Sequence, residues 1–226
     1  MKRAVLGIDT ATPATSVAVL VPGEREVERR DDPAAGERPR HAETLLVLIE
    51  EALAEAEVTW DDVERICVGT GPGGFTGLRL GISTARALAQ ARDLPLVGVS
   101  SLEALARGAE PAGHGLVLAV LDARRGEVFV AGYRDGRETL EPTAIAPAEL
   151  AERSPGPALA VGDGAVRFRT ELERAGATVP ADTSRAHRVS ALMICRLGRA
   201  REPVDRDALL PDYRREPDAV PPPPQT

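Results

Sequence analysis

Hydrophobic and polar stretches divide the first part of the chain into a hairpin, a loop and a helix. The runs AVLGI (4–8) and SVAVLV (16–21) are apolar and β-branched, and the turn-rich segment DTATPAT separates them, which predicts a β-hairpin. A third strand is expected at 25–30, before a charged loop that is rich in proline and glycine. Apolar residues then recur at the helical period, so we predict a helix at 41–56.

The helix at 41–56 carries more apolar surface than one sheet can cover. Its main stripe consists of Leu45, Leu48, Ile49, Ala52 and Ala56. Leu46, Val47 and Leu53 widen this stripe until the first half of the helix is apolar nearly all round. A helix that packs on a sheet normally buries one stripe and exposes the opposite face to water. We therefore expect either a second polypeptide or another part of this chain to cover the surplus.

Strands and helices alternate after this helix. The segment RICVGTG (65–71) reads as a strand that ends in glycines, and a helix is predicted at 77–91 with Thr76 as its N-cap. A strand at 94–99 follows, and the spacing of Ser100 to Glu103 fits a capping box for the next helix. Two apolar stripes run along helix 77–91, one formed by Leu78, Ile82, Ala85 and Ala89 and the other by Leu80, Thr84 and Leu88. Arg79, Ser83 and Arg86 lie between the stripes.

The second half of the chain repeats the plan of the first. The segments GLVLAVLD (115–122) and VFVAGY (128–133) predict another hairpin, and ALAVGDGA (158–165) predicts a strand that closes on a glycine turn before a helix near 166–175. Asp9 and Asp122 then occupy equivalent places at the ends of the first strands. The repeat predicts a duplicated α/β protein with lobes at 1–105 and 106–218 and a disordered, proline-rich tail at 219–226.

Composition and charge narrow the class of partner. The chain has 226 residues with a formal net charge of -7, so it has no general basic field that would collect nucleic acid. No apolar run approaches the length of a membrane span, and the first residues lack the long apolar run of a signal peptide, so a cytoplasmic location is expected. Cys67 and Cys195 have no CxxC spacing and no histidine neighbour, which favours two buried, reduced thiols.

The segment GTGPGGFTGLRLG (69–81) has the appearance of a phosphate-binding loop. Its glycine spacing fits the loop of P-loop NTPases, but Phe75 stands where that motif requires lysine, which excludes this class. A dinucleotide fingerprint also fits, yet the next strand ends in serines and not in the acid that binds ribose. Two alternatives remain open: the loop offers N–H groups to an anion at a helix N-terminus, or its glycines only allow a strand and a helix to pack closely.

Three segments, GIDTA, GPGGFTGLRLGISTARALA and DARRGEVF, resemble the TsaB (YeaZ) family of bacterial tRNA threonylcarbamoyladenosine biosynthesis proteins. Gly74 stands where this family usually has serine, and PDYRR is a loose match to its C-terminal Tyr-Leu-Arg pattern. The resemblance implies a two-lobed actin/sugar-kinase/Hsp70-like (ASKHA) fold of class α/β, with duplicated mixed-sheet lobes. That expectation agrees with the repeat seen in the pattern of strands.

The resemblance also implies a non-catalytic paralogue of TsaD, the subunit that transfers threonylcarbamoyl to an adenosine beside the anticodon of tRNA. We expect helices 41–56 and 77–91 to pair with two helices of TsaD, or with a second copy of this chain when TsaD is absent. The residues expected at this interface are His41, Leu45, Leu46, Ile49, Leu53, Leu78, Arg79, Ile82, Ser83 and Arg86. TsaE would join the assembly, tRNA would be contacted only through the complex, and no membrane is involved.

No catalytic residue, metal or tightly bound cofactor is expected. ATP or ADP is the candidate ligand near the junction with TsaD, where Arg79 and the glycine loop would contribute. The residues of this candidate phosphate loop are Asp9, Thr10, Gly73, Gly74, Thr76 and Gly77. His41, His114 and His187 are too far apart for a two-histidine metal site on one helix.

Two enzymatic alternatives remain. The first is an independent ATP-dependent phosphotransferase of the same fold that uses Asp9 and Asp122. The second is a peptidase, which is disfavoured because the sequence contains no serine, cysteine or metal constellation with suitable spacing.

Overall fold

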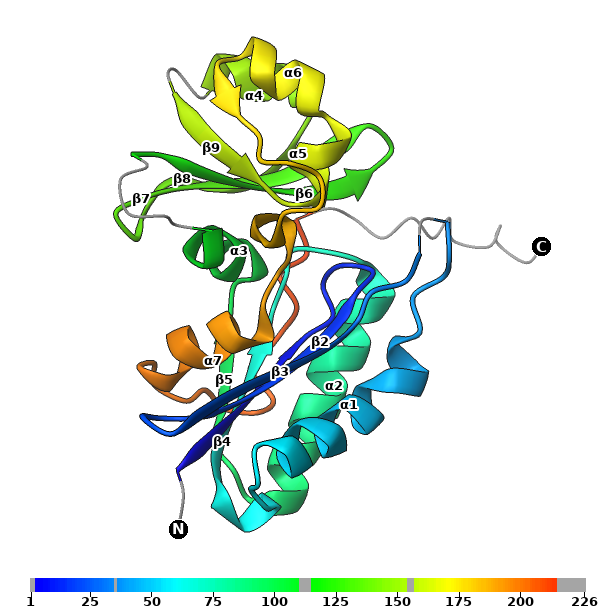
Figure 1. Ribbon diagram of the computed structural model, residues 1–226, viewed down its shortest axis with the longest axis vertical. Coiled ribbons are helices and arrows are strands. Elements are labelled where there is room, and N and C mark those ends of the chain that lie inside the picture. Colours follow the sequence, from blue (N-terminus) through cyan, green and yellow to red (C-terminus); the bar gives the residue numbers. More distant parts are fainter. Residues whose placement is uncertain (1–2, 35, 110–114, 154–156, 215–226) are drawn as a thin grey trace, which may run out of the picture.

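The computed structural model describes residues 3–34, 36–109, 115–153 and 157–214, which form two lobes (Figure 1) around two five-stranded sheets. The strands of the first sheet are β1 (Ala4–Asp9), β2 (Thr15–Val21), β3 (Arg25–Asp31), β4 (Val63–Gly69) and β5 (Leu96–Val99). Their order is β3-β2-β1-β4-β5. β1 pairs with β2 in the antiparallel sense and with β4 in the parallel sense, so the sheet is mixed.

The second sheet repeats the first. Its strands are β6 (Val117–Arg124), β7 (Glu127–Arg134), β8 (Arg137–Ile145), β9 (Ala158–Val161) and β10 (Ala177–Thr178). Their order is β10-β9-β6-β7-β8, which is the order of the first sheet when it is followed from the other edge. β6 again pairs with an antiparallel hairpin partner, β7, and with a parallel strand, β9. The predicted two-lobed ASKHA fold with duplicated mixed sheets is therefore confirmed.

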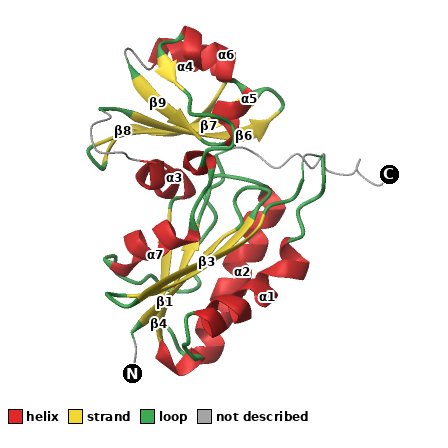
Figure 2. Ribbon diagram, viewed as in Figure 1, coloured by secondary structure: helices red, strands yellow, loops and turns green. Residues whose placement is uncertain are grey.

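Helices cover the sheets in layers (Figure 2). α1 (His41–Glu55) and α2 (Phe75–Arg92) lie on one face of the first sheet, and α7 (Ala191–Arg199) lies on the other. α3 (Ser101–Ala109) lies between α7 and the second sheet, whose far face is covered by α4 (Pro147–Arg153), α5 (Asp163–Arg167) and α6 (Arg169–Arg174). Short 3-10 turns, η1 (Trp60–Asp62) and η2 (Arg185–His187), complete the described chain. None of the described helices has the length and apolar character needed to cross a bilayer.

The layer formed by α3 and α7 gives the two lobes a common hydrophobic core. Val5 and Cys67 of the first sheet belong to the same buried cluster as Leu121 and Phe129 of the second. Cys195 of α7 is also in this cluster, so both thiols are buried, as predicted, and burial raises the pKa of Cys67 to about 12. Separate clusters fill the spaces under the α1–α2 pair and under α4 to α6.

Three predictions about helix caps and helix continuity differ from the structure. The prediction that Thr76 is the N-cap of its helix is wrong: Gly74 is the N-cap, and its carbonyl oxygen accepts the first helical bond from the Leu78 N–H at 2.9 Å. Ser100 does cap α3, since its hydroxyl accepts from the Glu103 N–H at 3.4 Å, but the Glu103 carboxylate binds Arg201 at 2.5 and 2.6 Å. The helix predicted near 166–175 is divided into α5 and α6.

α7 follows the second sheet in sequence but packs against the first. Its buried residues include Ala191, Ile194 and Cys195, and they lie on β1, β2 and β4. A Cβ atom on Gly7 of β1 would stand 2.4 Å from the Ala191 carbonyl oxygen, so the absence of a side chain there permits this contact. α7 therefore lies within the range predicted for the second lobe, 106–218, but packs on the sheet of the first, which lies within the predicted 1–105. The tail predicted at 219–226 lies outside the described residues.

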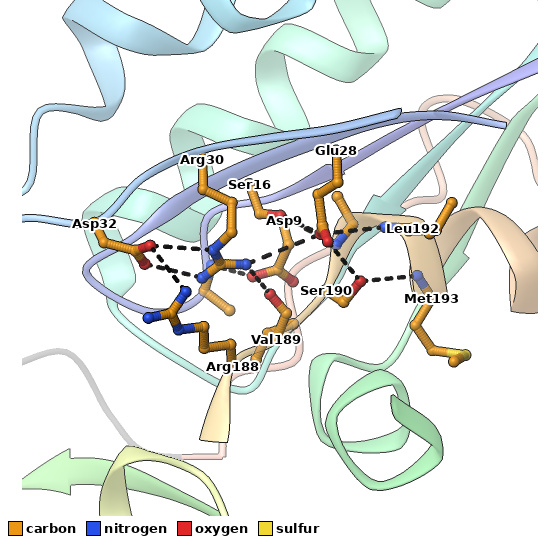
Figure 3. A network of polar contacts seen from close by, with 12 residues as sticks. Asp9, Ser16, Glu28, Arg30, Asp32, Arg188, Val189, Ser190, Leu192 and Met193 are labelled. Carbon is orange, nitrogen blue, oxygen red and sulfur yellow. Dashed lines mark hydrogen bonds and ion pairs between the residues drawn. The ribbon is translucent and has the colours of Figure 1, made fainter. Parts of the chain in front are cut away.

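A polar network fixes the segment that enters α7 (Figure 3). Glu28 of β3 accepts hydrogen bonds from the Ser16 hydroxyl at 2.9 Å and the Ser190 hydroxyl at 3.2 Å. It also accepts one from the Leu192 N–H at 3.4 Å, in the first turn of α7. Arg30 donates to the Val189 carbonyl oxygen at 2.5 Å. Because the carboxylate satisfies N-terminal donors of the helix, Glu28 positions α7 on the sheet.

We expect the substitution Glu28→Ala to lower the free energy of unfolding by about 1–3 kcal/mol, because it leaves partly buried donors without an acceptor. Glu26→Ala is the matched control: Glu26 lies on the same strand and pairs with Arg196 at 2.6 Å, but both side chains are more than two-fifths exposed. Its loss should stay below about 1 kcal/mol. Urea unfolding measures both changes, and equal losses would contradict the role assigned to Glu28.

Candidate functional site

A cleft of about 630 Å³ lies between the two lobes. Its lining comes from Thr10–Pro13 after β1, from the glycine loop and first turn of α2 at Gly73–Gly77, and from the second hairpin at Leu121–Arg124. The lining is completed by Arg38, Pro39, His41, Phe129, Asp163 and the segment Asp212–Arg214. The cleft thus brings together five of the six residues predicted for the phosphate loop: Thr10, Gly73, Gly74, Thr76 and Gly77.

Asp9, the sixth predicted residue, is buried beneath the turn that follows β1 and does not line the cleft. One carboxylate oxygen accepts from the Ala11 N–H at 3.1 Å, and the other accepts from the Ser101 hydroxyl at 2.6 Å. The Ser101 oxygen in turn accepts from the Gly71 N–H at 3.2 Å. Burial raises the pKa of Asp9, although these hydrogen bonds partly offset the effect. The acid therefore connects β1, α3 and the glycine loop within the protein.

The glycine loop packs directly against the turn between β1 and β2. A Cβ atom on Gly73 would stand 2.1 Å from the Ala11 carbonyl oxygen, and one on Gly77 would stand 2.2 Å from the Thr10 carbonyl oxygen. The Gly74 N–H donates to Ala11 at 2.7 Å, and the Thr10 hydroxyl donates to the Gly77 carbonyl at 2.8 Å. Of the two alternatives that the sequence left open, close packing accounts for these glycines.

An aromatic and cationic cluster stands at the edge of the cleft. The Arg79 guanidinium lies 3.8 Å from the centre of the Phe75 ring, and its Nε donates to the Tyr213 hydroxyl at 2.9 Å. The centres of the Phe75 and Tyr213 rings are 5.1 Å apart. Sequence reasoning did not find the role of Tyr213. The only signal was the loose PDYRR match, which carried no information on where that segment lies.

The acids of the second lobe are held by basic and backbone partners. Asp122 accepts from Arg167 at 2.7 Å and from the Arg124 side chain at 3.2 Å. Asp163, which sequence reasoning missed, accepts from the Asp122 N–H at 3.0 Å, and burial raises its pKa. Its position after Gly162, in the segment VGDGA, was the available signal. Asp122 thus occupies the place expected from the repeat, but its carboxylate is engaged by two arginines.

The two histidines that the structure describes form hydrogen bonds within the protein. His41, at the first turn of α1, shares a hydrogen bond of 2.8 Å between its Nδ1 and the Thr15 hydroxyl, and burial lowers its pKa. His187 bonds to the backbone of Gly162 at 3.1 Å, and His114 lies outside the described residues. Over the ranges that the structure describes, no three His, Cys, Asp or Glu side chains are grouped as metal ligands.

The structure divides the residues predicted for the partner interface into two groups. Six of them are buried within this chain: His41, Leu45, Ile49, Leu53, Leu78 and Ile82. Leu46, Arg79 and Ser83 are exposed, and Arg86 is half-buried and paired with Asp207 at 2.5 Å. The helical period alone did not separate these groups, because the apolar residues nearly encircle α1. Only the exposed group is available to a partner of the folded protein.

The fold and the cleft define a two-lobed protein of the actin and sugar-kinase type whose hairpin acids are bonded to its own chain. The sequence matches the family model described as "TsaD: tRNA N6-adenosine threonylcarbamoyltransferase" over residues 37–173. An uncharacterised protein of Mycobacterium tuberculosis is 44% identical over 162 residues, which are 70% of each chain. The tRNA threonylcarbamoyladenosine biosynthesis protein TsaB of Escherichia coli is 38% identical over 131 residues, covering 58% of this chain and 54% of that protein.

The solved structure of YeaZ from Pseudomonas aeruginosa superposes with a TM-score of 0.76 and 31% sequence identity. The match covers 93% of this chain and 99% of that chain. The chain belongs to the TsaB (YeaZ) family. The resemblance drawn from the three sequence segments is therefore confirmed.

We expect the substitution Gly73→Ala to lower the free energy of unfolding by about 1–3 kcal/mol, because its methyl group would overlap the Ala11 carbonyl oxygen. The matched control is Gly74→Ala, since the nearest atom to a Cβ there is 3.7 Å away and the residue has φ -63°. That change should cost less than about 1 kcal/mol. Thermal and urea unfolding compare the two variants. If Gly73→Ala were as stable as Gly74→Ala, close packing would not explain the loop.

The raised pKa of Asp9 predicts a pH-dependent difference between the wild type and Asp9→Asn. Because the folded state binds this proton more tightly than the unfolded state, the contribution of Asp9 to stability is complete below the ordinary pKa of 3.8 and is lost as the pH rises through the raised value. Asparagine does not titrate. The wild type should therefore lose stability relative to Asp9→Asn as the pH rises from 4, close to the ordinary pKa, to 8. Urea unfolding at both pH values measures this, and a constant difference would refute it.

Proposed function

We propose that this protein is a non-catalytic subunit that binds a TsaD-family transferase and holds it active in the complex that makes threonylcarbamoyladenosine next to the anticodon of tRNA. The TsaB relatives are named for the biosynthesis of this nucleoside, and family membership supports the same process here. The observation that carries the proposal is the exposed apolar surface on α1. Leu46 is 57% exposed and Val47 is 54% exposed, side by side on the outer face of a helix whose inner face is fully packed.

The exposed surface of α1 continues onto α2. Ser83 and Arg79 lie on the outer face of α2, which packs beside α1 on the same sheet. Contiguous exposed apolar patches on a soluble protein mark interaction sites. Two helices of a partner, laid on this pair, would form a four-helix contact of roughly the standard size, about 800 Å² from each protein.

The state of the acids favours a scaffold over an enzyme. A phosphotransferase of this fold would require a carboxylate free to hold a metal or activate a nucleophile in the cleft. Both oxygens of Asp9 are bonded to Ala11 and Ser101, and Asp122 is bonded to Arg124 and Arg167. No observation favours the independent ATP-dependent phosphotransferase. Turnover of ATP by the purified protein alone, abolished by Asp9→Asn, would favour it.

The remaining parts of the proposal concern the assembly. TsaE joins the same complex, tRNA is contacted only through it, and a second copy of this chain occupies the α1–α2 surface when the TsaD-family subunit is absent. ATP or ADP binds at the junction of the two subunits, next to Arg79 and the first turn of α2. A cytoplasmic location follows from this role. Family membership supports participation in this assembly.

The direct test replaces Leu46 and Val47 together by glutamate. The double variant should bind the TsaD-family subunit at least about tenfold more weakly, because two charges would be placed in the centre of an apolar contact. Formation of threonylcarbamoyladenosine in a reconstituted mixture should fall in parallel. Thr170→Glu, at an exposed position on α6, is the control and should leave both unchanged. Ile82 is unsuitable because it is only 3% exposed, and a glutamate there would unfold the core. Undiminished binding by the folded double variant would overturn the proposal.

A further inference from the structure

After α7 the chain returns along α2 as an irregular segment, residues 203–214, which we name the C-terminal strap. Near its start, the Val204 N–H donates to the Leu96 carbonyl oxygen of β5 at 2.9 Å. Arg206 then donates to the Ala89 carbonyl oxygen at 3.1 Å, close to the C-terminal end of α2. At its far end, the Asp212 N–H donates to the Thr70 carbonyl oxygen at 2.8 Å, beside the glycine loop. The strap therefore follows α2 from its C-terminal end to its N-terminal end.

Residues of the strap bind two arginine side chains of α2, Arg79 and Arg86, which belong to the proposed docking surface. Asp207 pairs with Arg86 at 2.5 Å, and the Tyr213 hydroxyl accepts from Arg79 at 2.9 Å. α1 covers β2 and β3 while the strap lies beside β5, so α1 and the strap are on opposite sides of α2. A partner that docks on α1 and α2 would meet the strap along the second side of α2.

The end of the strap is held less firmly than its middle. Leu209 is buried, and its side chain packs against Gly98 of β5, so it anchors the segment. Beyond it, Leu210 is 67% exposed and Tyr213 is 43% exposed. Residues 210–214 are held by the Asp212 backbone bond and by the contacts of Tyr213 with Phe75 and Arg79. Leu210 buries little apolar surface in this position, so its burial contributes little to holding this end of the strap closed.

We propose that residues 210–214 act as a latch that competes with the partner subunit for the N-terminal half of α2. In the closed position, Tyr213 covers Phe75 and holds Arg79 away from an incoming helix. In the open position, Phe75 and Arg79 join Leu46 and Val47 in the docking surface, while Leu209 keeps the strap attached. This inference rests on the proposed docking of a TsaD-family subunit and adds its regulation.

The latch also connects the docking surface with the cleft. Asp212, Tyr213 and Arg214 form part of the cleft wall, on the side of the first turn of α2. A partner that displaces them therefore opens this wall at the same time. For a partner that binds only the open form, the apparent affinity equals the intrinsic affinity multiplied by the fraction of molecules that are open.

The test compares full-length wild type with Tyr213→Ala in binding to the purified TsaD-family subunit by calorimetry. Removal of the ring and hydroxyl should tighten binding roughly five-fold, because more molecules are open before the encounter. Tyr213→Phe keeps the ring and loses the bond to Arg79, so it should give a smaller gain. Asp93→Ala removes the ion pair with Arg206 at the opposite end of the strap and should leave the affinity unchanged. Thermal unfolding checks that each variant remains folded.

Hydrogen exchange of the Asp212 amide gives an independent readout. Exchange should accelerate in Tyr213→Ala alone, and in the wild type when the partner subunit is added. Unchanged or weaker binding by Tyr213→Ala would overturn the latch, and so would unchanged exchange. Weaker binding would instead make the strap a part of the contact. If the wild type binds and the Leu46 and Val47 double variant does not, the docking proposal survives even when the latch fails.

Discussion

The close approach of α7 to the first sheet is the contact on which the arrangement of the two lobes depends. α7 lies against β1 where Gly7 has no side chain, and its own Gly198 faces Cys67, since a Cβ atom there would stand 2.4 Å from the Cys67 sulfur. With α7 seated this closely, α3 packs on it and carries the second sheet. The result is one buried cluster that contains residues of both sheets. A shared core of this kind resists separation of the lobes, because opening it would expose apolar surface from both.

Two acidic residues of the first sheet hold the helices that connect the lobes. Asp9 stands at the end of the first strand and bonds to Ser101 at the start of α3, while Glu28 bonds to Ser190 at the start of α7. These are the two places where the chain passes between the lobes. Each crossing is thus held by a carboxylate of the first sheet, and buried hydrogen bonds of this type cost stability when one partner is removed. The same bonds leave Asp9 unavailable for chemistry in the cleft.

The proposed role as a subunit of a tRNA-modifying complex follows from what these contacts leave exposed. The inner faces of α1 and α2 pack against the first sheet, and their outer faces, which include Leu46, Val47, Arg79 and Ser83, are exposed to solvent. The shared core fixes the position of this surface relative to the cleft. The C-terminal strap contacts both the cleft and the outer face of α2. A movement of the strap would therefore change the edge of the cleft and the α1–α2 surface together.

The sequence by itself determined the two hairpins, the alternating strands and helices, the repeat that relates the two sheets, and the family. These features depend on local periodicity and turn residues, which each segment carries regardless of its neighbours. It did not determine which apolar residues of α1 are buried, because a helix that is apolar nearly all round has no single inner face until a sheet is placed beside it. It also did not show that Asp9 is bonded to Ser101, that α7 returns to the first sheet, or that Tyr213 meets Arg79. Those pairs are separated by 92 to 134 residues or lie in different lobes, so only the packed tertiary structure brings them together.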